Sequence, residues 1–158
     1  MLEGESLYSF VTNIFLHGGW SHLFGNMLFL FIFGDNIEDI LGHLRYIFFY
    51  MICGVGASAV WMFTNLEGMV PAVGASGAIS GVLGAYFVLY PYARIRTLMG
   101  FGYFIRVIRV PAWLMIGLWF IYQLLLSFLP YNTGVAYWAH IGGFIIGWIC
   151  SRFLKQRF

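Results

Sequence analysis

Five apolar segments fill most of this chain, separated by short breaks rich in glycine, proline and polar residues. A helix that crosses a bilayer needs roughly 20 predominantly apolar residues. Four of the segments reach or nearly reach that length, whereas the third is short. The pattern predicts an all-α fold, a polytopic membrane helix bundle, in a single domain over residues 1–158. We expect about five transmembrane helices, at about residues 20–40, 46–64, 76–90, 112–129 and 135–153.

The composition fits a bilayer better than water as the solvent. Of the 158 residues, 61% are hydrophobic and 9% are charged, whereas a soluble domain has about 25% charged residues. A soluble globule with so few charges would expose large apolar patches. We therefore expect a multi-pass integral membrane protein with lipids around its helices. The two cysteines, Cys53 and Cys150, lie in separate apolar segments and indicate neither a metal site nor a disulfide framework.

The basic residues predict how the bundle is oriented. Cytoplasmic loops of membrane proteins carry an excess of Lys and Arg. If the chain crosses the membrane five times, all eight of these residues lie on the same side. They are Arg45, four arginines at residues 94–109, and three basic residues in the C-terminal tail. The segment before residue 20 and the loops at Asn65 and Asn132 contain none. We expect the C-terminus in the cytoplasm, the other loops outside, and an interfacial position for residues 92–110.

Four polar side chains should share one layer near the outer face. The first, third and fifth predicted helices run from outside to inside, so their N-terminal ends lie together. His22 and Asn26 fall in the first turns of the first helix, Ser76 opens the third, and His140 lies early in the fifth. A polar residue inside a membrane helix is a functional-site hypothesis by default. Structural roles also stay open: a helix cap for Ser76, a packed histidine for His140, and interfacial positions for His22 and Asn26.

Ser76 and His140 have the chemistry of a nucleophile and its base. A serine hydroxyl becomes nucleophilic when a base removes its proton, and histidine, which titrates near neutrality, is the usual base. No carboxylate lies at their depth, so the pair would be a dyad without the acid of the usual triad. The backbone N–H of Ser76, at a helix N-terminus, would stabilise an oxyanion. His22 and Asn26, on one face of the first helix, would add further donors.

Glycines explain how the third and fifth helices could meet. Gly77 and Gly81 are one helical turn apart, and so are Gly143 and Gly147. Such stripes of small residues let two helix backbones approach closely in a membrane. Together with Gly74, which precedes the third helix, these glycines are expected to pack the helices at the site. The GxxxG spacing by itself indicates packing and not catalysis.

Three motifs resemble those of one known family. Gly74-Ala75-Ser76-Gly77 resembles the GxSG motif of the rhomboid intramembrane serine proteases. The stretch from His17 to Asn26 resembles the family segment that ends in HxxxN, and residues 139–143 resemble the segment that holds the catalytic histidine of the family. The resemblance runs from about Leu7 to Phe153, and three motifs in the right order make it specific.

This resemblance implies a site and a mechanism. It implies Ser76 as the nucleophile, His140 as the general base, and an oxyanion site made by His22, Asn26 and the backbone N–H of Ser76. The family cleaves transmembrane substrates near their outer ends and uses no metal and no cofactor. The implied partners are transmembrane protein substrates and membrane lipids, with no nucleic acid. For a member of bacterial type, the implied location is the inner cell membrane, with the active site open to the outer face.

The chain departs from the family pattern in two respects. The usual core has six helices, and its first helix, with the long outer loop after it, has no counterpart here. Some members also carry a tyrosine at the position of Ser80, packed under the histidine, so another side chain must orient the imidazole here. Ser80 is expected instead to bond the backbone carbonyl one turn before it. Gln123 is expected to form an interhelical hydrogen bond.

Two other classes of function compete with a protease. An inactive rhomboid-like protein would bind membrane clients without cleaving them, but intact Ser76 and His140 argue against it. A transporter or channel would need an ion path through the membrane, and no intramembrane carboxylate or basic residue marks one. We therefore predict an intramembrane serine endopeptidase that cleaves transmembrane substrates near their outer end with a Ser76–His140 dyad.

Overall fold

The computed structural model of the chain describes residues 8–65, 73–101, 104–129 and 134–154. A short helix α1 (Ser9–Thr12) and a 3-10 turn η1 (Asn13–Phe15) come first. An antiparallel hairpin of β1 (Arg94–Phe101) and β2 (Phe104–Pro111) connects the third long helix to the fourth. The long helices are α2 (Trp20–Leu41), α3 (His43–Thr64), α4 (Ser76–Leu89), α5 (Ala112–Ser127) and α6 (Tyr137–Ser151).

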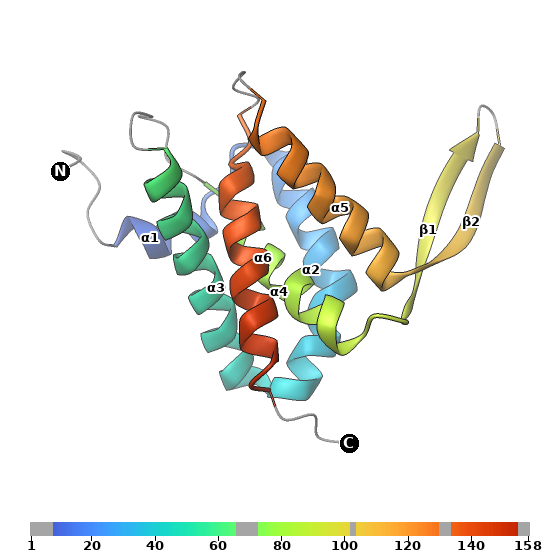
Figure 1. Ribbon diagram of the computed structural model, residues 1–158, viewed down its shortest axis with the longest axis horizontal. Coiled ribbons are helices and arrows are strands. Elements are labelled where there is room, and N and C mark those ends of the chain that lie inside the picture. The colour runs from blue at the N-terminus through green and yellow to red at the C-terminus, as the bar shows by residue number, and fades with distance from the viewer. Residues whose placement is uncertain (1–7, 66–72, 102–103, 130–133, 155–158) are drawn as a thin grey trace.

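The predicted all-α bundle is confirmed, because long helices occupy all five apolar segments (Figure 1). In Figure 1, α2, α4 and α6 run downward, and α3 and α5 run upward. The N-terminal ends of α2, α4 and α6 therefore lie toward the same end of the bundle. Among these three helices, α4 begins deepest in the bundle, and Ser76, which opens it, is partly buried.

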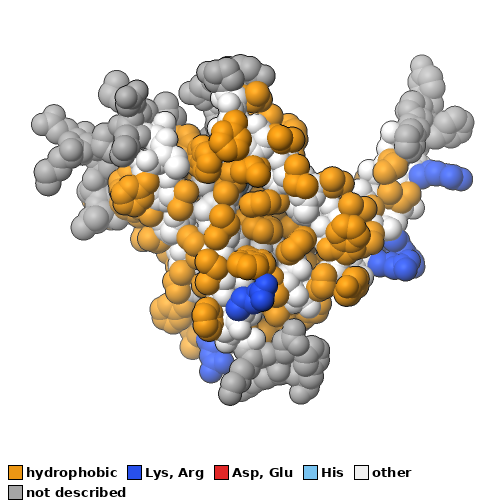
Figure 2. Space-filling view, viewed as in Figure 1, with side chains coloured by type: hydrophobic (Ala, Val, Ile, Leu, Met, Phe, Trp, Pro, Cys, Tyr) orange, Lys and Arg blue, Asp and Glu red, His pale blue; other side chains and the backbone are white. Residues whose placement is uncertain are grey.

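The surface of the bundle is apolar. Figure 2 shows hydrophobic side chains over most of the visible face, with basic side chains only in its lower part and along the hairpin. Large side chains such as Phe31 and Phe48 are 74% and 68% exposed, which suits lipid and not water. Among the described helices, α3 is the one long and apolar enough to cross a bilayer by itself, and α4 and α5 are shorter apolar helices.

Gly42 alone joins α2 to α3. Its φ of +74° lies in the left-handed region that favours glycine. Its N–H donates to the Glu38 carbonyl at 2.7 Å, and its own carbonyl accepts from the Tyr46 N–H at 3.0 Å. Because the connection is this short, Arg45 lies in the first turn of α3 and not in the predicted loop.

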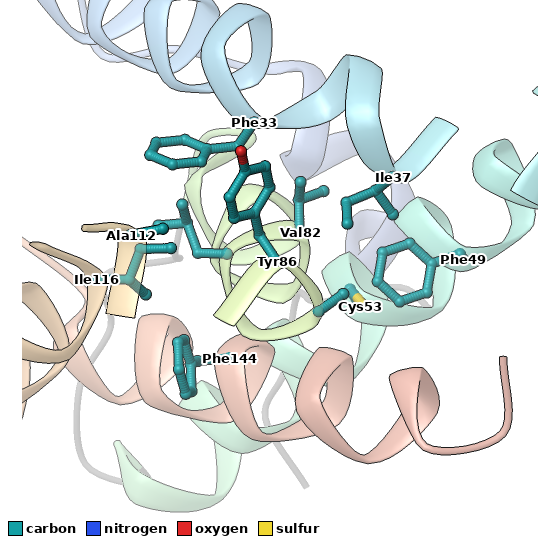
Figure 3. Packing of buried hydrophobic residues seen from close by; sticks show 11 residues of the cluster. Phe33, Ile37, Phe49, Cys53, Val82, Tyr86, Ala112, Ile116 and Phe144 are labelled. Carbon is teal, nitrogen blue, oxygen red and sulfur yellow. The ribbon is translucent and has the colours of Figure 1, made fainter. Parts of the chain in front are cut away.

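The core is built around α4, whose residues from Gly77 to Tyr86 are all buried. A helix that is apolar on all sides belongs in the interior of a bundle. Figure 3 shows side chains from the neighbouring helices gathered around it, with Phe33 from α2 and Phe144 from α6 on different sides. The rings of Phe33 and Tyr86 meet edge to face, with centroids 5.0 Å apart. This packing holds α4, and therefore Ser76 at its start, in one position.

Glycines let α4 and α6 approach closely, and α4 makes its most extensive contacts with α6. A Cβ added at Gly143 would collide with the carbonyl oxygen of Gly77, and one added at Gly147 would collide with that of Gly81. The two stripes of glycine thus face each other across the helix pair. Because Gly77 and Gly143 lie near the beginning of their helices, this approach also brings the first turns of α4 and α6 together.

The β1–β2 hairpin lies in the segment that was predicted only to be interfacial. Its register pairs Arg94 with Pro111 and Arg96 with Arg109. The hairpin projects from the bundle beside α5 (Figure 1). The signal for strands is present in the sequence, because Ile95 alternates with arginines on β1 and β-branched residues are frequent on β2.

Candidate active site

Ser76 and His140 form a hydrogen-bonded pair. Ser76 is the first residue of α4, and His140 lies in the first turn of α6. These are the two helices whose backbones approach at the glycines. The distance between Ser76 Oγ and His140 Nε2 is 2.9 Å, which is a normal hydrogen-bond length. In this geometry an imidazole can take the proton of a serine hydroxyl.

The other nitrogen of the imidazole bonds Gln123. His140 Nδ1 lies 2.8 Å from Gln123 Oε1, and Gln123, on α5, is 6% exposed. A carbonyl oxygen only accepts, so Nδ1 carries the ring proton and the lone pair of Nε2 faces Ser76. The predicted interhelical hydrogen bond of Gln123 is confirmed, and its partner is the histidine.

Ser80 does not orient the imidazole. Its hydroxyl donates to the Ser76 carbonyl at 2.6 Å, as predicted for a serine one turn further along a helix. The side chain that takes over this task is Gln123, which sequence reasoning did not assign to the site. One signal could have found it. Because α5 runs opposite to α4 and α6, a polar residue near its C-terminal end falls in the same layer as Ser76 and His140.

His22 lies against the loop that precedes Ser76. Gly74 in this loop has a φ of +114°, and a Cβ added there would come within 2.7 Å of His22 Cε1. The Gly74 N–H donates to the Asn13 carbonyl at 2.8 Å, which ties the loop to η1. His22 Nδ1 accepts from the Gly18 N–H at 3.4 Å. The ring proton of His22 is therefore on Nε2, on the side of Gly74.

The side-chain amide of Asn26 has a hydrogen-bond donor without a partner in the described part of the chain, also near Gly74. It is 7% exposed, and its buried Nδ2 has no hydrogen-bond partner among the described residues. Nδ2 lies 3.5 Å from the Cβ position of Gly74, close to the loop that leads to Ser76. A buried polar atom without a partner costs about 1–3 kcal/mol. A donor kept in this state is available to an acceptor that arrives with a ligand.

One cavity, of about 780 Å³, joins these side chains, and Ser76, His140, His22 and Asn26 all border it. Its wall comes from one end of the bundle, namely the N-terminal ends of α2, α4 and α6 and the C-terminal ends of α3 and α5. That is the end predicted to face outward. Gln123 is not part of the wall and lies behind His140. Large aromatic residues complete the lining: Phe29, Trp61, Trp119, Tyr137 and Trp138.

The described part of the chain contains no group of three His, Cys, Asp or Glu side chains that could hold a metal ion. Cys53 is buried in the core and Cys150 is partly buried, and both are free thiols. That the protein works without a metal or cofactor stays a prediction.

Comparison with known protein families decides to which family this chain belongs. The family model described as the Rhomboid domain matches residues 4–157, which is nearly the whole sequence. The chain belongs to the rhomboid family. Rhomboid proteins are integral to membranes and, in general, act on membrane protein substrates.

Several curated proteins are similar to this rhomboid chain. RHOMBOID-like protein 5 of Arabidopsis thaliana is 34% identical over 155 residues, which cover 98% of this chain and 46% of that protein. Rhomboid protein 1, mitochondrial, of Saccharomyces cerevisiae is 30% identical over 168 residues, 96% of this chain and 44% of that protein. A Bacillus subtilis protein named "Putative rhomboid protease YdcA" is 28% identical over 153 residues, 94% of this chain and 69% of that protein. The chain thus spans less than half the length of the first two relatives. None of the solved structures matches it.

Proposed function

We propose that this rhomboid chain is an intramembrane serine endopeptidase that cleaves transmembrane substrates near their outer end with a Ser76–His140 dyad. The observation that carries the proposal is the 2.9 Å contact between Ser76 Oγ and His140 Nε2 at the wall of a cavity inside the bundle. The similarity to a Bacillus subtilis protein that is named a rhomboid protease supports it. A hydrolase inside a membrane also needs room for water, which the cavity provides.

The reaction begins when Ser76 Oγ attacks the carbonyl carbon of the scissile peptide while His140 Nε2 takes the hydroxyl proton. The carbonyl π electrons move to the oxygen, which gives a tetrahedral oxyanion. When this collapses, the C–N bond breaks, and the imidazolium gives its proton to the leaving amine. Water, deprotonated by His140, then attacks the acyl group on Ser76. The bond between the acyl carbon and Ser76 Oγ then breaks, Oγ takes the proton back from the imidazolium, and the second fragment leaves with a new carboxyl end.

Three donors near Gly74 and Ser76 could stabilise the oxyanion. The backbone N–H of Ser76 opens α4 and has no acceptor within the helix. Asn26 Nδ2 is buried and unpaired, and His22 presents its Nε2–H toward Gly74 because Nδ1 accepts from Gly18. Donors fixed in advance in a site of low dielectric stabilise the developing charge without having to reorganise. We therefore assign the oxyanion site to His22, Asn26 and the Ser76 backbone.

The basic residues support an orientation for the bundle. Arg45, in the first turn of α3, and Arg152, just after α6, lie at the end of the bundle opposite the cavity. We infer a cytoplasmic C-terminus and an active site open to the outer face of a bacterial inner membrane. Residues 1–158 would act as one rhomboid-like membrane domain, surrounded by lipids.

The test is the cleavage of a transmembrane reporter by the purified chain in lipid vesicles. We expect two fragments, with the cut near the outer end of the membrane segment of the reporter, and no effect of a metal chelator. A reporter that binds the chain and stays intact under all conditions would reject the protease and favour the inactive, client-binding alternative.

Replacing Asn26 by alanine should slow cleavage without abolishing it. One donor to the oxyanion would be lost, which typically lowers kcat by roughly 10²–10³-fold, while Ser76 and His140 stay in contact. Reporter cleavage in vesicles measures the effect. Asn36→Ala, further along α2 and outside the cavity wall, serves as the matched control. Full activity of Asn26→Ala would remove this residue from the oxyanion site.

A further inference from the structure

Gln123 occupies the place that a carboxylate takes in the usual triad of serine proteases. Its Oε1 lies 2.8 Å from His140 Nδ1, while Nε2 of the same ring lies 2.9 Å from Ser76 Oγ. The three side chains form one hydrogen-bonded line that runs from α5 through α6 to α4. Two aromatic rings flank the imidazole, with centroids 6.1 Å away for Trp119 and 6.5 Å away for Tyr137.

We propose that Gln123 is a positioning residue for the reaction, an inference that rests on the proposed function. Its carbonyl oxygen accepts the Nδ1–H of His140 and so selects the tautomer whose Nε2 lone pair faces Ser76. The same bond fixes the rotation of the ring between its aromatic neighbours. Without this acceptor, the ring is free to turn or to change tautomer, and Nε2 is no longer held as a base.

A neutral amide suits this position better than a carboxylate. An ionised carboxylate buried inside a bundle carries a large desolvation cost unless a cation pairs with it. The described basic residues lie at the other end of the bundle or on the hairpin, as Arg45, Arg152 and the β1–β2 arginines show. Gln123 supplies the acceptor that a triad needs without adding a charge.

The test compares two variants of nearly equal size. Gln123→Met keeps the length of the side chain but removes the acceptor, and should lower kcat of reporter cleavage roughly 10- to 100-fold with little change in KM. Gln123→Glu keeps an acceptor oxygen and should recover most of this activity at neutral pH.

Two further measurements distinguish a wrong role for Gln123 from a wrong proposed function. Ser151→Ala, at the far end of α6, removes a buried hydroxyl that bonds only within its helix and reports the effect of a purely structural change. Labelling by a serine-directed probe, counted per folded molecule, gives a readout that does not depend on the substrate. A wild-type chain that the probe never labels would reject the proposed function. If the probe labels the wild type but Gln123→Met reacts at the same rate, only the role of Gln123 is rejected. The same holds if the Gln123→Met and Gln123→Glu variants have equal rates.

A second, independent inference concerns the face of the β1–β2 hairpin that turns away from the bundle. The inward face contacts α5, where Thr97 Oγ1 donates to Met115 Sδ at 3.8 Å. On the outward face, Arg96 is the direct cross-strand partner of Arg109, and Arg94 lies beside them at the base. The register places three exposed apolar side chains on the same face, nearer the tip: Leu98, Ile105 and Val107.

The arginines and apolar side chains of this outward face would suit a partner that has an anionic group beside an apolar region. Like charges directly opposite each other destabilise a pair of strands, and the carboxylates of the described residues all lie on α2 without an ion pair to the hairpin. We infer that the face binds anionic phospholipids. Its arginines would bond the phosphates, and Leu98, Ile105 and Val107 would enter the acyl chains. Arg106 lies on the opposite face, across from Met99, and takes no part.

Photo-crosslinking in nanodiscs tests the lipid site. A photoactivatable phosphatidylglycerol, in a bilayer of phosphatidylcholine, should label β1 and β2 in the wild-type chain. In the triple variant Arg94→Gln, Arg96→Gln, Arg109→Gln, the extent of labelling should fall about tenfold. Arg45→Gln, outside the hairpin, should be labelled like the wild type. Equal labelling by a phosphatidylcholine probe, or no loss in the triple variant, would overturn the inference.

Discussion

Replacing Ser76 by alanine should abolish cleavage of a transmembrane reporter, with kcat lowered by roughly 10⁶-fold. The variant lacks the oxygen that attacks the peptide carbonyl. Ser80, one turn further along α4 and on the same cavity wall, cannot replace it because its hydroxyl donates to the Ser76 carbonyl at 2.6 Å. The fold should persist, since the lost hydrogen bond to His140 contributes only about 1 kcal/mol. Reporter cleavage in vesicles and thermal unfolding of the same sample measure both effects.

The control for this variant is Ser151→Ala, which also removes a serine hydroxyl but at the opposite end of α6. It should cleave the reporter at the wild-type rate. Product formed by Ser76→Ala at a comparable rate would mean that another residue is the nucleophile. Loss of both activity and folding in Ser76→Ala would instead give this serine a structural role.

Replacing Gly143 by alanine should impair both stability and activity. The added Cβ would collide with the carbonyl oxygen of Gly77, so α4 and α6 would have to separate. Overpacking of this kind costs about 1–3 kcal/mol and occasionally more. The first turns of the two helices carry Ser76 and His140, and a displacement of about 1 Å at a catalytic pair can lower the rate roughly 10²-fold. Thermal unfolding and reporter cleavage, measured together, should both fall.

Gly117→Ala on α5 is the matched control, because a Cβ there meets only Phe87 Cε2 at 3.7 Å, an ordinary contact. Alanine favours a helix over glycine by roughly 0.5–1 kcal/mol, so this variant should be as stable as the wild type or more so. If Gly143→Ala behaved in the same way, the close approach of α4 and α6 would not be what holds Ser76 against His140.

Much of the fold could be predicted because a bilayer leaves few choices for an apolar chain. Apolar segments of about 20 residues have the length of a spanning helix, and a helix satisfies every backbone polar group within its own segment. The boundaries followed from proline, glycine and polar breaks, as at Pro111 before α5. The hairpin could not be predicted from apolar length, because its signal is alternation over a few residues. Gly42 likewise gave no sign that it alone would join α2 to α3.

The site was partly predictable for a topological reason. Alternating helix directions put the starts of α2, α4 and α6 in one layer, so Ser76, His140, His22 and Asn26 could be grouped before any distance was known. The same topology puts Gln123 in this layer, but its contact with His140 could not be predicted, because that contact depends on the rotation of α5 about its own axis. A change of one residue in that rotation would turn Gln123 away from His140, and the sequence contains no marker of it.

Labelling of the reconstituted chain with a serine-directed fluorophosphonate probe tests the central claim most directly, namely that His140 activates Ser76. The measurement needs no substrate, so it reports the nucleophile alone. We predict that the wild-type chain is labelled, that the label maps to Ser76, and that Ser76→Ala and His140→Ala stay unlabelled while still folded. Equal labelling of the wild type and Ser76→Ala, or a folded wild type that takes no label, would contradict the claim.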